Sequence, residues 1–92
     1  MKKIKSKCGH IAYSVTAKEL GKIGGLGICD WCNQFDEEGF LIPVLNRFYC
    51  RKCYPGWEQR AEYYTEDEPF ELDTAQYYES IIGLDEEGET NG

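Results

Sequence analysis

Two Cys-x-x-Cys pairs are the residues of this chain whose type and spacing point most directly to chemistry. Cys29 and Cys32 form the first pair, Cys50 and Cys53 form the second, and 17 residues separate the pairs. Two intervening residues let both thiolates of a pair reach one ion, at about 2.3 Å per zinc–sulfur bond. Four thiolates complete a closed tetrahedron that leaves no position for water or substrate. The sequence therefore predicts one structural zinc ion, on which folding depends.

Cys8 and His10 form the other group that could do chemistry. The chain has no further Cys or His to complete a second metal site, so only Asp or Glu could add ligands there. A nucleophilic Cys8 with His10 as its base is another alternative, although no oxyanion donor can be identified for it. A cysteine beside a turn more often packs as a small apolar side chain. We therefore expect one zinc ion, no catalytic residue and a protein that is not an enzyme.

Composition favours a small protein of the cytoplasm. Ninety-two residues suffice for one small domain, whose limited core a metal ion would stabilise. The five cysteines are an odd number, and the opening Met-Lys-Lys-Ile-Lys is not followed by the apolar run of a signal peptide. No stretch reaches the roughly 20 apolar residues of a membrane helix. These features predict a reducing, cytoplasmic location and no membrane partner, rather than a disulfide framework.

The net charge of −7 is distributed unevenly along the chain. Residues 1–29 carry six Lys and one Glu, whereas residues 54–92 carry twelve acids and one Arg. In one interpretation, the two ends attract each other and the remaining charges are solvated. In the other, the lysine-rich start or the acidic end faces a charged partner.

The first 28 residues are expected to form a β segment and a glycine-rich loop. Apolar residues alternate from Ile11 to Val15, which predicts a strand that follows a turn at Gly9. Thr16 and Glu19 have the spacing of a capping box at the start of one short helical turn. The glycine-rich loop then leads into the first cysteine pair.

The segment between the cysteine pairs is expected to form a hairpin. Residues 40–44 and 48–49 predict two short strands that return the second pair to the first. Pro43 has no amide donor, so the first of these is expected to be an edge strand or to carry a bulge. Asn33 follows the first pair, where a left-handed backbone is expected.

A helix is predicted after the second pair. Pro55 suits its first turn, and one helical face carries Tyr54, Trp57, Ala61 and Tyr64. The three aromatic residues of this face are expected to pack on the hairpin as core. A second helix is predicted from Asp73 to a stop at Gly83, and residues 85–92 are expected to be a disordered acidic tail. For Tyr63, Tyr77 and Tyr78, a place in the core and a place in a protein interface are both open.

Residues 29–64 place a Cys-x-x-Cys pair, a hairpin, a second pair and a helix in that order, which resembles a treble-clef zinc finger. The spacing of the cysteines is similar to that of a GATA-type finger. The segment is also similar to one lobe of a LIM domain. The aromatic strand Phe48-Tyr49 that enters the second pair carries this resemblance together with the spacing. GATA-type fingers bind DNA through a helix and a basic extension. Here Glu66-Asp67-Glu68 stands where that extension would lie, and acids repel phosphate. LIM-like lobes act as protein-binding platforms, an implication that agrees better with the charges.

The sequence thus predicts an α+β fold in a single zinc-stapled domain, residues 1–84. Its parts are an N-terminal β segment (1–28), a treble-clef-like module (29–64) and an acidic segment with a C-terminal helix (65–84). We expect an adaptor or regulator that binds an unknown protein partner through its aromatic, acidic C-terminal part. One alternative is nucleic-acid binding through the lysines of the first segment, Lys2, Lys3, Lys5 and Lys7. Another is an acidic surface that mimics nucleic acid.

Overall fold

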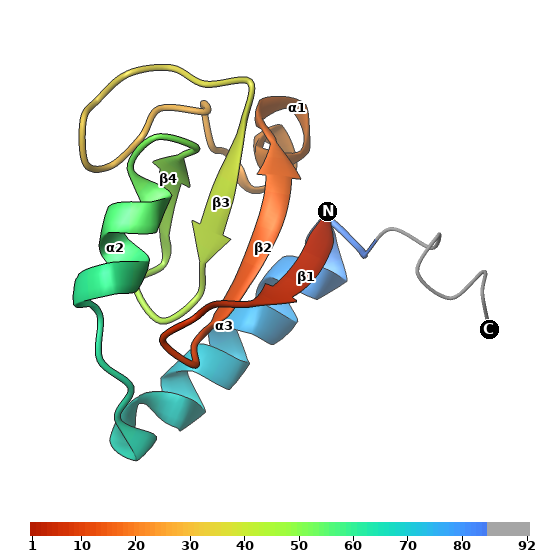
Figure 1. Cartoon of the computed structure of the whole chain (residues 1–92). Helices are drawn as coiled ribbons and strands as arrows, with labels where there is room; N and C mark the ends of the chain where they lie inside the picture. Colours follow the sequence, from red (N-terminus) through yellow and green to blue (C-terminus); the bar gives the residue numbers. More distant parts are fainter. Residues whose placement is uncertain (85–92) are drawn as a thin grey trace, which may run out of the picture.

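The computed structural model describes residues 1–84, so the predicted acidic tail, residues 85–92, lies outside the described part. The helices and strands are, in chain order, β1 (Lys2–Lys5), β2 (Ile11–Thr16), α1 (Ala17–Leu20), η1 (Gly21–Ile23), β3 (Glu38–Ile42), β4 (Arg47–Cys50), α2 (Tyr54–Arg60), η2 (Thr65–Asp67) and α3 (Glu68–Ile81). Four antiparallel strands and a C-terminal helix make an α+β fold, which confirms the predicted class (Figure 1).

The sheet has the strand order β1-β2-β3-β4, and each strand is antiparallel to its neighbour. β3 is therefore an interior strand, and it pairs one to one with both neighbours. The prediction that residues 40–44 form an edge strand or carry a bulge is wrong. The strand ends at Ile42, and Pro43 lies in the turn, where the amides of Leu45 and Asn46 donate to the carbonyls of Ile42 and Pro43. Because Pro43 supplies only a carbonyl there, its missing N–H costs the sheet no hydrogen bond.

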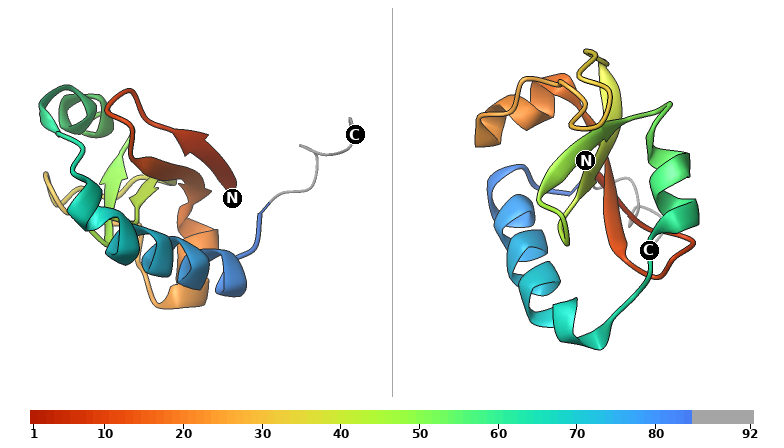
Figure 2. Two further views of the ribbon diagram at one scale, coloured as in Figure 1. Left: turned by 90° about the horizontal axis from the view of Figure 1, so that it is seen from below. Right: turned by 90° about the vertical axis from the view of Figure 1, so that its left-hand side faces the viewer.

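Alternate residues of the strands face two separate cores, because successive side chains point to opposite faces of a sheet. Tyr13, Leu41 and Phe48 lie in the core that α3 covers, whereas their neighbours Ala12 and Ile42 lie in the core of α2 and the cysteines. Figure 2 shows α2 and α3 on opposite sides of the sheet. The chain thus places the four cysteines and the acidic helix in different layers.

The short N-terminal elements agree with the sequence patterns. β2 spans the predicted alternating segment, and Gly9 has φ +98° in the turn before it. The capping box is complete: Thr16 Oγ1 accepts from the amide of Glu19, and the Glu19 carboxylate accepts from the amide of Thr16 at 3.0 Å. Asn33 has φ +62°, which confirms the left-handed position after the first pair.

α2 is shorter than predicted, because the backbone turns extended at Ala61, with ψ 148°. The carbonyl of Glu62 then accepts a hydrogen bond from His10 Nε2 at 2.9 Å instead of continuing the helical ladder. Tyr54 and Trp57 are buried, as expected. Tyr64 lies beyond the helix and is 51% exposed, so its predicted place in the core is wrong.

α3 begins at Glu68 instead of after Asp73. Pro69, which the sequence pattern places after a helix end, lies in the first turn, where its missing amide would have no intrahelical partner. Tyr78 is fully buried and donates to Asn46 Oδ1 at 2.6 Å, so it belongs to the core. Tyr77 is 51% exposed on the same helix. Gly83 lies just beyond the end of α3 and has φ +83°, as expected for a helix stop.

Candidate metal centre

The four predicted ligands converge at one point between β4, α2 and the loop before β3. The Sγ atoms of Cys29, Cys32, Cys50 and Cys53 all lie within 4.8 Å of one another. The Sγ atoms of Cys32 and Cys50 are 3.8 Å apart. Bonds of about 2.3 Å in a tetrahedron place sulfur atoms about 3.8 Å apart, so the separation fits zinc. The arrangement can hold one tetrahedral ion.

The first pair lies in a tight backbone turn that aims amide groups at a sulfur. The amides of Trp31 and Cys32 donate to Cys29 Sγ at 3.3 and 3.5 Å. The amide of Asn33 donates to the Cys29 carbonyl at 2.9 Å, which closes the turn at its left-handed residue. These donors stabilise negative charge on the sulfur, as a metal-bound thiolate requires.

Two aspartates connect the loop of the first pair to the strand that carries the second pair. Asp30 exchanges two hydrogen bonds with Phe48 of β4: its amide donates to the Phe48 carbonyl at 2.8 Å, and its carboxylate accepts from the Phe48 amide at 3.0 Å. Asp36 accepts from the Arg51 guanidinium at 2.8 Å and from the Arg51 amide at 3.1 Å. The Arg51 side chain and backbone thereby lower the pKa of Asp36 to about 2.

The sequence analysis did not identify these aspartates as positioning residues. Asp30 lies inside the first Cys-x-x-Cys pair and contacts Phe48, whereas Asp36 follows that pair and contacts Arg51 inside the second pair. The spacing of the sequence carries no signal for either contact. One contact joins the loop of the first pair to β4 and the other joins it to the turn after β4, so both hold together the segments that carry the two pairs.

The thiols have unequal acidities in the absence of a cation. Burial opposes ionisation of Cys29, but the backbone donors of Cys32, Cys50 and Trp31 outweigh it and lower the pKa to about 7. Burial and the neighbouring thiols raise the pKa of Cys53 to about 12. Four thiolates cannot share this space at neutral pH without a counter-charge, which a bound divalent ion would supply.

Two of the four cysteines lie inside the fold, and the aromatic side chain next to Cys32 is held by its neighbours. Cys29 and Cys50 are buried, and the other two ligands are half-buried. Trp31 packs edge-on against Tyr49, with ring centroids 6.2 Å apart, and the Arg60 guanidinium lies 4.0 Å from the centroid of the Trp31 ring. With four sulfur ligands, the site has no open coordination position, which is the arrangement of structural rather than catalytic zinc.

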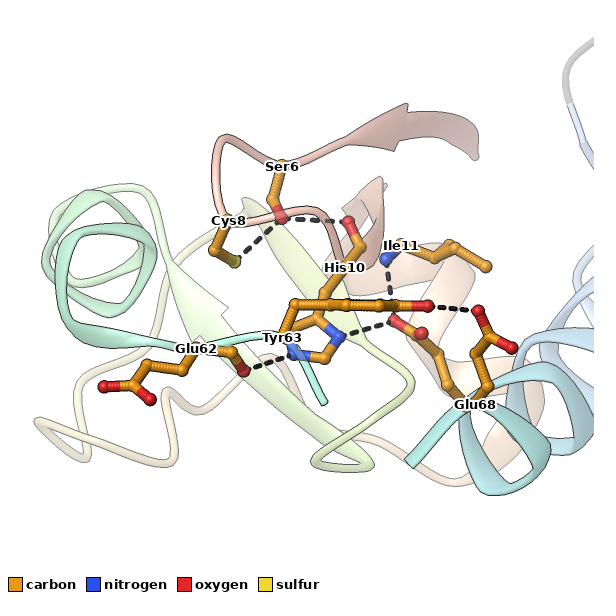
Figure 3. A network of polar contacts seen from close by, with 8 residues as sticks. Ser6, Cys8, His10, Ile11, Glu62, Tyr63 and Glu68 are labelled. Carbon is orange, nitrogen blue, oxygen red and sulfur yellow. Dashed lines mark hydrogen bonds and ion pairs between the residues drawn. The ribbon is translucent and has the colours of Figure 1, made fainter. Parts of the chain in front are cut away.

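Cys8 and His10 do not come together into a second site. Cys8 Sγ lies 3.0 Å from Ser6 Oγ, and Figure 3 shows the His10 ring turned away from Cys8. His10 Nδ1 lies 3.0 Å from Glu71 Oε2, and Nε2 contacts the Glu62 carbonyl. Both ring nitrogens are therefore occupied. Among residues 1–84, the four cysteines are the group of ligating side chains that converges.

The contact of His10 with Glu71 is a buried junction that the sequence analysis missed. It joins the start of β2 to α3 across 61 residues, and both side chains are almost fully buried. The amide of Ile11 donates to the same Glu71 oxygen at 2.8 Å, and Tyr63 covers the imidazole at a ring distance of 5.1 Å. A carbonyl only accepts, so Nε2 is the donor in its contact with Glu62.

No helix within residues 1–84 combines the length and the apolar composition needed to cross a bilayer. Comparisons with protein-family models, with curated proteins and with solved structures find no match to this chain.

Proposed function

We propose that the protein is a non-enzymatic protein-binding module whose fold depends on one structural zinc ion. The observation that carries the proposal is the convergence of four cysteine sulfurs within 4.8 Å of one another. Four thiolates saturate tetrahedral zinc, so the ion would stabilise the fold instead of activating a substrate. The hairpin β3–β4, the second pair and α2 follow one another as in a treble-clef finger, which supports that family resemblance.

A binding role is supported by the apolar side chains that the fold leaves exposed on its acidic helix. Phe70, Tyr77 and Ile81 of α3 are 52, 51 and 44% exposed. Grouped apolar side chains of this size on a small domain are typical of interaction surfaces. Tyr63 and Tyr77 are the two exposed members of the tyrosines considered for an interface, since Tyr78 is core.

Two observations support a role without catalysis and without nucleic acid. The imidazole of His10 has both nitrogens engaged, so it has no free nitrogen to serve as a base. Lys3 pairs with Glu79 at 3.3 Å, which removes part of the positive charge that the lysine-rich strand would offer to phosphate.

The proposal is tested by counting metal ions per chain with native mass spectrometry, while circular dichroism follows folding during chelation. We expect one zinc ion per chain and loss of the native spectrum when the ion is removed. The Cys8→Ser variant is the matched control and should keep the ion. A chain that stays folded without metal, or that loses its ion through Cys8→Ser, would contradict the proposal.

A further inference from the structure

One face of α3, continued by its N-cap Asp67, carries a row of exposed and half-buried residues. Asp67, Phe70, Thr74, Tyr77 and Ile81 follow one another at alternating spacings of three and four, which places them on one side of the helix. The buried residues Ala75 and Tyr78 lie on a different side. From Phe70 to Ile81 the row is about 16 Å long, at 1.5 Å per residue. We call these five residues the outer row.

A hollow lies at the N-terminal end of the outer row. It has a volume of about 380 Å³ between the β3–β4 turn and the segment that enters α3. Its lining includes Val44, Leu45, Glu62, Tyr64 and Asp67. Asp67 belongs both to the hollow and to the outer row, so the two features are continuous.

The hollow combines apolar walls with negative charge. Val44, Leu45 and the ring of Tyr64 supply apolar surface, while Glu62 and Asp67 supply carboxylates. Tyr64 donates to Glu62 Oε1 at 2.5 Å, and that carboxylate raises the pKa of Tyr64. A long aliphatic stem that ends in a cation matches this lining, because the stem can pack on apolar surface while the head meets carboxylate and an aromatic face.

The segment that enters α3 and α3 itself carry charge of one sign. Residues 61–84 contain seven Asp and Glu residues and no Lys or Arg. Asp73 and Glu66 are exposed beside the outer row. A partner that covers the apolar side chains must also neutralise these carboxylates, because unpaired charge in an interface is costly.

We propose that the hollow and the outer row together bind a basic amphipathic helix of a partner protein. A lysine or arginine of that helix enters the hollow between Glu62 and Asp67. Its apolar side chains cover Phe70, Tyr77 and Ile81, in the helix-to-groove mode of recognition. The inference rests on the proposed function and names the surface and the class of partner.

The test uses the zinc-loaded full chain and a synthetic helical peptide of about 14 residues, the length of α3, with Leu and Lys at alternating spacings of three and four. Binding is followed by fluorescence anisotropy at physiological salt, and the perturbed amides are mapped by NMR. We expect Glu62→Gln/Asp67→Asn and Phe70→Ser/Tyr77→Ser each to weaken binding at least about tenfold, as loss of a central contact does. The perturbed amides should lie in the hollow and along the outer row.

Matched controls separate this site from general attraction to an acidic protein. Glu37→Gln/Glu38→Gln removes the same charge from exposed positions outside the site, and Leu26→Ser removes a 77% exposed apolar side chain elsewhere. Both should bind the peptide within about twofold of the unmodified chain, since neither touches the site. Equal weakening by the controls would overturn the assignment.

Failure of the inference and failure of the proposed function give different results. A zinc-loaded, folded chain that does not bind the peptide overturns the basic-helix partner and leaves the structural zinc intact. A dimer in sedimentation equilibrium that Phe70→Ser/Tyr77→Ser dissociates would instead assign the outer row to a second copy of the chain. A chain that binds no metal contradicts the proposed function before the peptide is added.

Discussion

The metal centre and the His10–Glu71 junction both join segments that are distant in sequence, but they do so with different chemistry. The first gathers four thiols, and the second pairs an imidazole with a carboxyl group. The metal centre takes two ligands from each of two tight turns, with Sγ atoms within 4.8 Å of one another. The junction takes one side chain, His10, from the residue before β2 and the other, Glu71, from α3, 61 residues away. The comparison teaches that local spacing reveals a coordination site, whereas a buried polar pair is revealed only by the register of the helix that carries it.

The largest effect is expected from breaking the metal centre. Cys29→Ser removes one thiolate and the sulfur that accepts two backbone amides. Apparent zinc-binding free energies in small fingers are about 10–16 kcal/mol, so its loss exceeds the stability of a typical domain. We expect no bound zinc and loss of the β3–β4 hairpin, measured by metal analysis and NMR. A native NMR spectrum without metal would show that the hairpin folds by itself.

Breaking the junction should have the next largest effect. Glu71→Leu leaves the His10 nitrogen and the Ile11 amide without their shared acceptor, and removal of one partner of a buried pair costs about 3–5 kcal/mol. Denaturant unfolding of the zinc-loaded protein measures this cost, and the metal content should not change. Glu66→Leu, on the exposed side, is the control. If the double variant His10→Leu/Glu71→Leu is no more stable than Glu71→Leu, the two side chains do not act as a pair.

Alkaline pH should sharpen the comparison, because buried tyrosines lie in both cores. Burial, followed by Glu79 for Tyr13 and Glu58 for Tyr54, raises the pKa of each hydroxyl above its usual range. A raised folded-state pKa stabilises the protein below the unfolded-state value of about 10, and this stabilisation is lost as the pH increases beyond it. We expect the denaturant concentration at the unfolding midpoint to decrease as the pH increases from about 10 to about 11.

Two phenylalanine variants assign that pH dependence to the two cores. Tyr13→Phe should flatten it through the core covered by α3, and Tyr54→Phe should do so through the core that contains the cysteines. A midpoint that stays constant to pH 11 in the unmodified protein would show that both hydroxyls ionise freely in the fold.

The smallest effect is expected at the surface of the metal centre. Arg60→Gln removes the guanidinium from the face of Trp31, where its centroid distance is 4.0 Å. An exposed cation–π contact contributes about 0.5–1 kcal/mol. The free energy of unfolding should decrease by that amount, and zinc content should remain at one per chain. A loss of zinc in this variant would mean that Arg60 protects the ligands as well as packing on the indole.

Several local features could be predicted from the sequence because their causes lie within a few residues. The capping box of Thr16 and Glu19 forms within one helical turn, and the left-handed Asn33 closes one tight turn. The four cysteines meet because each pair is a local unit and a short hairpin returns one pair to the other. Asp30 and Asp36 were missed, since their partners are found only after the hairpin has formed.

The elements after the second pair were predicted less well, because contacts with the β1–β2 hairpin override their local signals. The backbone is extended at Ala61, where another helical turn was predicted. The Glu62 carbonyl accepts a hydrogen bond from His10 there instead of from a helical amide. The early start of α3 brings Glu71 to the buried side of the helix, where it meets His10. Neither choice has a signal within the segment itself.

By itself the sequence determined the four ligands, the sulfur chemistry of their site, the α+β class and the strong negative charge of the second half, because composition and short spacing specify each of them. Only the tertiary structure decided that β3 is interior, that His10 binds Glu71 instead of a metal, and that Tyr78 is core while Tyr77 faces solvent. The physical reason is that burial depends on which surfaces pack together, and a polar side chain finds its partner only when both have left water in the same place.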